Sequence, residues 1–140
     1  MSSEAMAFDA GKYRVLVVDD EPAVLYTYRL ILEQEGYVTV AVASAREALE
    51  RLAAEDFHLL LCDYSLEEKR TGFEVINAAR QKNPTVPCLL LTGYANQGTI
   101  TEAEKADVTV LFKPIDMDEF LSTIPSKLKE AYETTTASKK

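Results

Sequence analysis

The stretch YRVLVVDDEPA, residues 13–23, joins an apolar run directly to acidic residues and a proline. The apolar, β-branched part predicts a buried strand over residues 14–19. Pro22 suits the first turn of a helix, so we expect the chain to pass from strand into helix immediately after the acids. Asp19 and Asp20 repel each other and lose hydration at the end of a buried strand, so their placement there needs a physical reason.

The rest of the chain repeats this alternation of short apolar runs and helical patterns. Strands are predicted at residues 14–19, 37–43, 57–63, 86–92 and 108–112, and helices at about 22–35, 44–54, 73–82 and 98–106 and after Asp116. Strands separated by helices predict an α/β sandwich around a parallel sheet with right-handed crossovers. In such folds the functional residues lie at the carboxyl ends of the strands.

Local signals mark where the helices begin and end. Gly36 is expected to close the first helix, and Asp116 to cap the last one. Ser44, followed three residues later by Glu47, predicts a capping box at the start of the second helix. Pro125 falls inside the last helix and is expected to kink it or split it.

The composition indicates one acidic globular domain. The 140 residues carry a formal net charge of -8, from 15 basic and 23 acidic side chains. Direct nucleic-acid binding is not expected, because phosphate contacts need clustered lysine and arginine. No apolar run approaches a membrane span, and the N-terminus lacks the basic start and apolar segment of a secretory signal. We therefore expect a cytoplasmic protein without membrane contact.

The cysteines Cys62 and Cys88 lie inside apolar runs, which favours buried thiols in a reducing compartment. A zinc site would need more ligands of this kind than the chain offers, unless carboxylates completed it. A Cys–His nucleophile would have to combine Cys62 with His58. These two lie four residues apart in one predicted strand, on the same face but too distant for a hydrogen bond.

Four of the five predicted strands end in an ionisable or hydroxyl residue. These residues are Asp19 and Asp20, Asp63, Thr92 and Lys113. Each alone is explained by a helix start, a cap, an ordinary β residue or a surface lysine. Together they favour a functional site, because a parallel sheet brings the carboxyl ends of its strands to one edge.

Carboxylates gathered at one edge repel each other unless a cation neutralises them. Hard oxygen ligands suit Mg²⁺, which keeps several waters and shares its coordination sphere with phosphate oxygens. A lysine ammonium offsets further negative charge, and a threonine hydroxyl can donate to a phosphoryl oxygen. The set therefore predicts phosphoryl transfer to a carboxylate.

The motifs VLVVDDEP, LLLCD, LLLTG and LFKP, in this order, resemble the receiver domain of bacterial two-component response regulators (CheY-like). The resemblance covers about residues 14–130. It implies a (βα)5 flavodoxin-like three-layer sandwich with a five-stranded parallel sheet in the order 2-1-3-4-5. We expect the receiver domain to span residues 13–132, with flexible segments at 1–12 and 133–140.

The resemblance also implies a role for each site residue. Asp63 is expected to be the phosphoacceptor, taking its phosphoryl group from a histidine kinase or a histidine phosphotransfer protein. Asp19 and Asp20, Asp63 and the backbone carbonyl of Ser65 are expected to bind Mg²⁺. Lys113 would contact the phosphoryl oxygens, and Thr92 would move to hydrogen-bond the phosphoryl group.

Three residues depart from the family pattern. Val110 stands three before Lys113, where the family usually has an aromatic switch residue, so the usual threonine–aromatic coupling is not expected. Glu67 stands four after the acceptor, where proline is common, in a highly charged loop. Tyr94, two after the conserved threonine, is expected to shield the acyl phosphate and slow its hydrolysis.

The leading interpretation is a stand-alone receiver that acts through a protein partner or relays phosphate, because no output region follows residue 133. Its only chemistry would be Mg²⁺-dependent self-phosphorylation and autodephosphorylation. The alternative is a phosphorylation-independent interaction module, favoured by Val110 and opposed by the intact acidic pair. A haloacid-type phosphatase is disfavoured, because Asp63 is followed by Tyr64 and Ser65 rather than by a second aspartate two residues on. No phosphate-binding glycine motif is present either.

Overall fold

The computed structural model describes residues 8–93 and 96–133. Its sheet is parallel throughout, with the order β2-β1-β3-β4-β5, which confirms the predicted fold class. The strands are β1 (Arg14–Val18), β2 (Val38–Val42), β3 (Leu59–Asp63), β4 (Cys88–Thr92) and β5 (Thr109–Phe112). The helices are α2 (Pro22–Gln34), α3 (Ala45–Ala54), α4 (Gly72–Lys82), α5 (Gln97–Lys105) and α6 (Met117–Tyr132), with short 3-10 turns η1 (Ala10–Lys12) and η2 (Glu67–Lys69).

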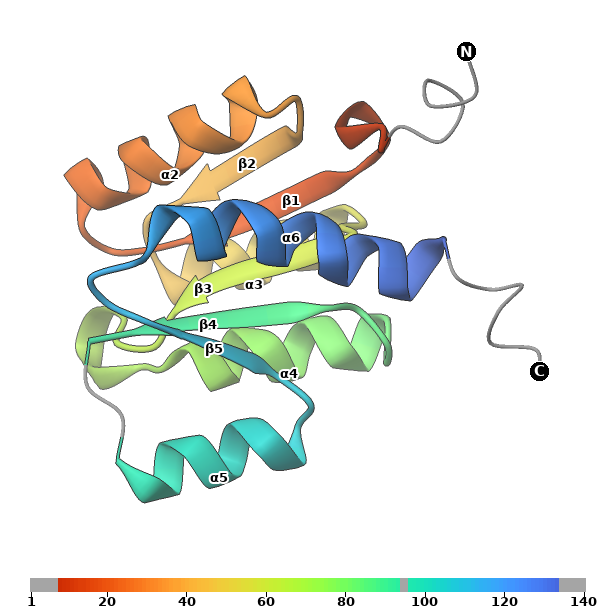
Figure 1. The fold of residues 1–140 in the computed structure, drawn as a ribbon. Helices are drawn as coiled ribbons and strands as arrows, with labels where there is room; N and C mark the ends of the chain where they lie inside the picture. Colours follow the sequence, from red (N-terminus) through yellow and green to blue (C-terminus); the bar gives the residue numbers. More distant parts are fainter. Residues whose placement is uncertain (1–7, 94–95, 134–140) are drawn as a thin grey trace, which may run out of the picture.

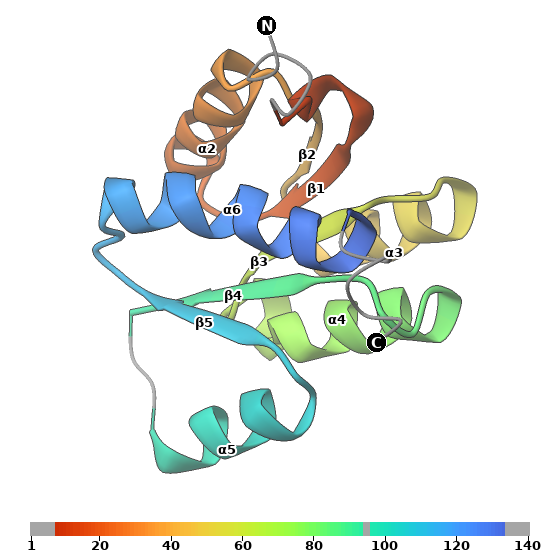
Figure 2. The same cartoon turned by 45° about the vertical axis from the view of Figure 1, so that its right-hand side comes forward.

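The helices form two layers, one on each face of the sheet (Figures 1 and 2). Helices α2 and α6 cover one face, and α3, α4 and α5 cover the other. Within β1, Leu16 and Val18 point to the layer of α3, α4 and α5, and Val15 and Val17 point to the opposite layer. Strands covered on both faces must be apolar at every position, and β3 and β4 are accordingly buried along their whole length.

The predicted helix ends and caps at Gly36, Ser44 and Asp116 are confirmed, except that Glu47 binds a different backbone N–H. Gly36 has a φ of 101°, a conformation that glycine adopts without strain just after the end of α2. The hydroxyl of Ser44 accepts a hydrogen bond from the backbone N–H of Glu47, as the capping box predicts. The Glu47 carboxylate, however, accepts from the backbone N–H of Ala43 at 3.0 Å, one residue before the position expected. Asp116 caps α6 through the backbone N–H of Glu119.

Pro125 was predicted to kink or to split the last helix, and the structure shows that it does not split it. Helix α6 runs unbroken from Met117 to Tyr132 across this proline. The buried residues Phe120, Ile124 and Leu128 lie on both sides of it and hold the helix against the sheet. A proline inside a helix costs roughly 3 kcal/mol, and burying three large apolar side chains contributes more than that.

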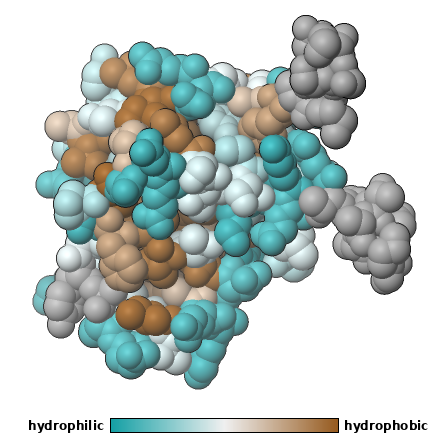
Figure 3. Space-filling view, in the orientation of Figure 1, coloured by the Kyte–Doolittle hydropathy of each residue, from teal (hydrophilic) through white to brown (hydrophobic). Residues whose placement is uncertain are grey.

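Figure 3 shows apolar side chains on the face seen in Figure 1, over α2 and over β5, on either side of the more polar surface of α6. The exposed large apolar residues of the described chain include Tyr26 and Leu30 of α2 and Phe112 of β5, which is 52% exposed. No helix in the described part of the chain is long and apolar enough to cross a membrane.

Aromatic residues gather at the amino ends of the strands. Phe8 stacks on Tyr13 with ring centroids 5.4 Å apart, so part of the segment before β1 packs on the domain. The His58 ring packs edge-on against both Tyr13 and Tyr132, and the Tyr132 hydroxyl donates to the His58 carbonyl at 2.8 Å. The Nδ1 atom of His58 accepts a hydrogen bond from the backbone N–H of Arg14 at 2.9 Å, so this ring is bound in its neutral form.

The domain is expected to lose stability at mildly acidic pH through His58. Burial, together with the nearby charge of Arg14, lowers the pKa of His58 from its ordinary value of 6.5. The unfolded chain then takes up the proton first, so the free energy of unfolding falls as the pH drops from 6.5 towards the lower folded-state pKa. The loss should be about 1 kcal/mol, because protonation removes the acceptor of the Arg14 N–H.

Urea unfolding at neutral and at mildly acidic pH measures this effect. The matched control is His58→Asn, because the amide oxygen can accept the Arg14 N–H but does not titrate in this range. The wild-type protein should lose more stability than the variant between the two pH values. Equal losses in the two proteins would show that His58 does not contribute.

Candidate functional site: an acidic pocket at the carboxyl ends of the strands

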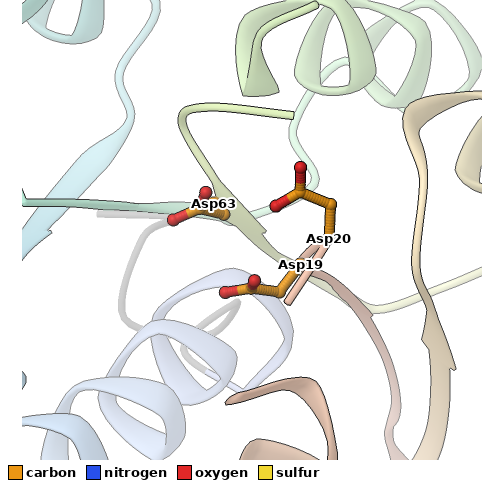
Figure 4. Close-up of side chains that lie close together, drawn as sticks. All are labelled: Asp19, Asp20 and Asp63. Carbon is orange, nitrogen blue, oxygen red and sulfur yellow. The ribbon is translucent and has the colours of Figure 1, made fainter. Parts of the chain in front are cut away.

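Three carboxylates meet where β1 and β3 end. Asp19 and Asp20 follow β1, and Asp63 is the last residue of β3, the neighbouring strand in the sheet. One carboxylate oxygen from each lies within 4.8 Å of those of the other two. Figure 4 shows the three side chains close together, with Asp19 and Asp20 from one segment and Asp63 from another. The sheet topology therefore brings together residues that are more than 40 positions apart in the chain.

Two of these carboxylates are buried. Asp19 has no exposed surface and Asp63 is 7% exposed, whereas Asp20 is exposed. Burial raises the pKa of Asp19 above its ordinary value, although a hydrogen bond from the backbone N–H of Glu21 opposes the rise. Burial also raises the pKa of Asp63, and the adjacent Asp19 charge adds to this effect. The pocket therefore carries negative charge that the protein balances only in part.

Lys113 is the cation that faces this cluster. Its ammonium nitrogen lies 2.6 Å from Oδ1 of Asp63 and 3.5 Å from Oδ2 of Asp19. Burial disfavours the charged lysine, but the hydrogen bond and charge of Asp63 outweigh this, and the pKa of Lys113 is raised. The lysine follows β5, at the edge of the sheet, and its backbone N–H donates to the carbonyl of Thr92 at 2.8 Å. The Lys113–Pro114 peptide bond is cis.

Thr92 and Ser65 complete the pocket. An open cavity of ≈ 350 Å³ is lined by Asp63, Tyr64, Ser65, Thr92, Gly93 and Lys113. Thr92 is buried at the end of β4, and Ser65 is exposed in the loop after β3. The structure thus places all six residues predicted from the sequence at one edge of the sheet.

The donor set of the pocket fits a divalent cation. The oxygens of Asp19, Asp20 and Asp63 are hard ligands close enough to share one ion, and Lys113 alone does not neutralise them. Mg²⁺ is held in proteins by one or two carboxylates together with water and phosphate oxygens, which matches a partly open acidic pocket. The paired aspartates thus belong to a carboxylate cluster whose donor set suits a divalent cation.

Glycine at position 72 is a feature that sequence reasoning missed. A Cβ atom placed on Gly72 would lie 2.6 Å from the backbone carbonyl oxygen of Asp63 and 2.8 Å from Cδ1 of Leu90. Only glycine lets the start of α4 approach the acceptor strand this closely. A glycine immediately before a predicted helix, soon after a strand that ends in a candidate site residue, was the available signal.

The remaining predicted features are placed as follows. Val110 is partly buried and packs against the core beneath α3, α4 and α5. Tyr94 lies outside the described residues. Cys62 is a fully buried free thiol, and burial raises its pKa well above the ordinary value, so it does not serve as a nucleophile. Cys88 is also free and buried.

Comparison with known proteins assigns this fold to a family. Residues 15–125 match the family model of the response regulator receiver domain. The chain is 31% identical over 125 residues to the transcriptional regulatory protein ZraR of Salmonella typhimurium, covering 89% of this chain and 28% of ZraR. It is 34% identical over 113 residues to an uncharacterized 14.6 kDa protein of Leptolyngbya boryana, covering 79% of this chain and 86% of that protein. The chain thus spans less than a third of the length of ZraR.

Solved structures agree. A CheY-like receiver domain protein from Methanospirillum hungatei superposes with a TM-score of 0.80 and 32% identity, covering 85% of this chain and 95% of that one. The response regulator TrrA of Thermotoga maritima, solved in complex with Mg(2+)-BeF, superposes with a TM-score of 0.73 and 27% identity, and the match covers 82% of this chain and 98% of TrrA. With its sheet order, its acidic pocket and the match over residues 15–125, the chain belongs to the response regulator receiver domain family.

Proposed function

We propose that this receiver domain accepts a phosphoryl group on Asp63 from a phosphohistidine of a histidine kinase or a histidine phosphotransfer protein. The observation that carries this proposal is the position of Asp63, which lies between a lysine ammonium at 2.6 Å and two further carboxylates. Its carboxylate also lines an open pocket, so a donor can reach it. The domain acts as a phosphorylated signalling module with no separate substrate.

The carboxylate of Asp63 is the nucleophile. One of its oxygens forms a bond to phosphorus while the bond between phosphorus and the donor imidazole nitrogen breaks, and the electron pair of that bond stays with the imidazole. The product is an acyl phosphate. Lys113, already paired with Asp63, is placed to follow the transferred group and to offset its charge.

Asp19, Asp20, Asp63 and the backbone carbonyl of Ser65 would hold Mg²⁺. When bound, the ion neutralises charge on the transferring phosphoryl oxygens. The backbone N–H of Glu21 donates to Oδ1 of Asp19 at 2.9 Å and orients this carboxylate for its role. The structure of TrrA in complex with Mg(2+)-BeF supports a magnesium site in a receiver domain of this kind.

Thr92 would transmit the new charge to the rest of the domain. Its hydroxyl lines the same pocket as Asp63, so a phosphoryl group on Asp63 would lie within its reach. Since Val110 cannot rotate like a large aromatic ring, we propose that the response passes through the loop after β4 and the short helix α5, which changes population between two states.

A groove beside α2 is proposed as the docking place of the donor protein. It has a volume of ≈ 400 Å³ and is lined by residues of α2 and of the segment that joins β5 to α6, among them Val24, Tyr28 and Ile115. Lys113 lines both this groove and the pocket of Asp63. A groove with apolar lining residues that shares a lysine with the phosphorylation pocket suits a helical protein partner that presents a phosphohistidine.

Removal of the divalent cation is expected to abolish phosphorylation. The protein is incubated with acetyl phosphate and Mg²⁺, or with acetyl phosphate and excess EDTA, and the fraction carrying a phosphoryl group is measured by intact-mass spectrometry. Label should appear only with Mg²⁺, because the carboxylates of the pocket otherwise repel the phosphate. Equal labelling with EDTA would contradict the proposed magnesium site, and no labelling under either condition would contradict phosphoryl acceptance.

A further inference from the structure

The loop after Asp63 is closed on itself. Ser65 and Thr71 form an isolated antiparallel bridge, and the backbone N–H of Gly72 donates to the carbonyl of Tyr64 at 2.8 Å. The backbone N–H of Leu66 donates to the carbonyl of Arg70 at 2.9 Å. This loop contains Ser65, whose carbonyl is proposed to bind the cation, so its geometry affects the metal site.

The loop has a strained backbone at its tip. Glu68 and Lys69 have φ angles of 54° and 64°, in the left-handed region that residues with a Cβ disfavour. Such conformations are disfavoured for residues with a Cβ and persist only where the surroundings hold them. Something outside the tip must therefore fix the loop, and buried Leu66 is one anchor.

Glu67 is the second anchor, and it reaches another element. Its Oε1 atom accepts a hydrogen bond from the backbone N–H of Ala45 at 2.8 Å, and Oε2 accepts from the backbone N–H of Arg46 at 3.3 Å. These are the first two N–H groups of α3, which has no intrahelical acceptors for them. The carboxylate also lies at the positive end of the helix dipole, which favours a negative charge.

The helix does not depend on Glu67 for its cap. The hydroxyl of Ser44 already accepts from the N–H of Glu47, and Glu67 lies 22 residues after Ala45 in the chain. Arg70 approaches Glu67 at 3.7 Å but forms its closer pair, at 2.7 Å, with Glu74. The two bonds from α3 are therefore the main polar contacts of the Glu67 carboxylate, and they tie the acceptor loop to a rigid element.

Given the proposed function, we propose that Glu67 is a positioning residue for the divalent-cation site. It lies two residues after Ser65, and its bonds to α3 hold in place the loop that carries Ser65, which lines the same pocket as Asp63. A proline at this position would provide no carboxylate. The tether is thus a property of this chain's own loop.

Magnesium binding to purified variants tests this assignment. Isothermal titration calorimetry with MgCl₂ is applied to the wild type, Glu67→Ala, Glu67→Gln and Glu74→Ala. Loss of the tether should weaken Mg²⁺ binding about tenfold in Glu67→Ala, as for other residues that orient metal ligands. Glu67→Gln keeps an amide oxygen that can accept from one N–H and should fall between wild type and Glu67→Ala.

Glu74→Ala is the matched control. It removes a glutamate that also pairs with Arg70 but does not contact α3, so its Mg²⁺ affinity should equal that of the wild type. Amide hydrogen exchange at Ala45 and Arg46 should become faster in Glu67→Ala, even without metal. At saturating Mg²⁺ the rate at which acetyl phosphate labels Glu67→Ala should return to that of the wild type.

Two outcomes overturn the assignment. The first is an unchanged Mg²⁺ affinity in Glu67→Ala. The second is a loss of stability in both Glu67 variants without weaker Mg²⁺ binding in Glu67→Gln. Either result would show that Glu67 only stabilises the fold. Failure of the proposed function has a different signature, because the wild type itself would then bind no Mg²⁺ and accept no phosphoryl group.

Discussion

Replacement of Asp63 by asparagine is expected to abolish phosphorylation while leaving the domain folded. The amide has nearly the shape of the carboxylate, but its oxygen is a poor nucleophile, so no acyl phosphate can form. The asparagine oxygen can still accept a hydrogen bond from Lys113, which now lies 2.6 Å from Oδ1 of Asp63. The buried side chain at position 63 therefore keeps a polar partner. The loss of phosphorylation is then not expected to come from a general loss of structure.

Intact-mass spectrometry after incubation with acetyl phosphate and Mg²⁺ measures this result. The matched control is Asp56→Asn, which removes an aspartate whose side chain is 94% exposed and which lies outside the pocket. This control should be labelled to the same extent as the wild type. Labelling of Asp63→Asn at the wild-type level would place the acceptor elsewhere, with Asp19 and Asp20 as the next residues to replace.

Replacement of Gly72 by alanine is expected to destabilise the domain by about 2–3 kcal/mol, as overpacking of a close contact does. The added Cβ would lie 2.6 Å from the Asp63 carbonyl oxygen, 2.8 Å from Leu90 Cδ1 and 3.2 Å from Cys62 Sγ. The carbonyl cannot move away freely, because the next backbone N–H, that of Tyr64, donates to Leu91 O at 2.8 Å. A shift of this backbone would displace Asp63 and slow phosphoryl transfer as well.

Urea unfolding and the rate of labelling test both parts of this prediction. Gly11→Ala is the control, because its added Cβ would meet its nearest neighbour, Oδ1 of Asp9, at an ordinary 3.4 Å. Stability and labelling of the control should stay close to wild type. If Gly72→Ala unfolds at the wild-type urea concentration and is labelled at the wild-type rate, the close approach of α4 to β3 does not constrain the site.

Much of the fold follows from patterns that are local in the chain. The strand predicted over residues 14–19 is observed as Arg14–Val18, and the helix predicted over 98–106 as Gln97–Lys105. Apolar runs and helical periodicity depend on which side chains are buried, and burial in this sheet follows the sequence pattern. The gathering of Asp19, Asp20, Asp63, Thr92 and Lys113 at one edge was also predicted, since parallel strands bring their carboxyl ends to one edge. Ser65 was expected only from the family resemblance.

Features that depend on neighbours in space were not predicted. Pro125 suggested a kinked or split helix, but α6 continues across it, with buried side chains against the sheet on both sides of the proline. Glu67 suggested only a charged loop, but it binds the start of α3, and the requirement for glycine at position 72 comes from the carbonyl of Asp63. No pattern within a short window contains these partners.

The sequence alone therefore determined the order of strands and helices and the kinds of side chain at the sheet edge, because both depend on local hydrophobicity and on the carboxyl-end rule for parallel sheets. Only the folded structure shows the distances between these side chains. These include the 2.6 Å contact of Lys113 with Asp63 and the tether of Glu67 to α3. Such distances arise from packing between segments far apart in the chain, where small shifts in position change the electrostatic energy strongly.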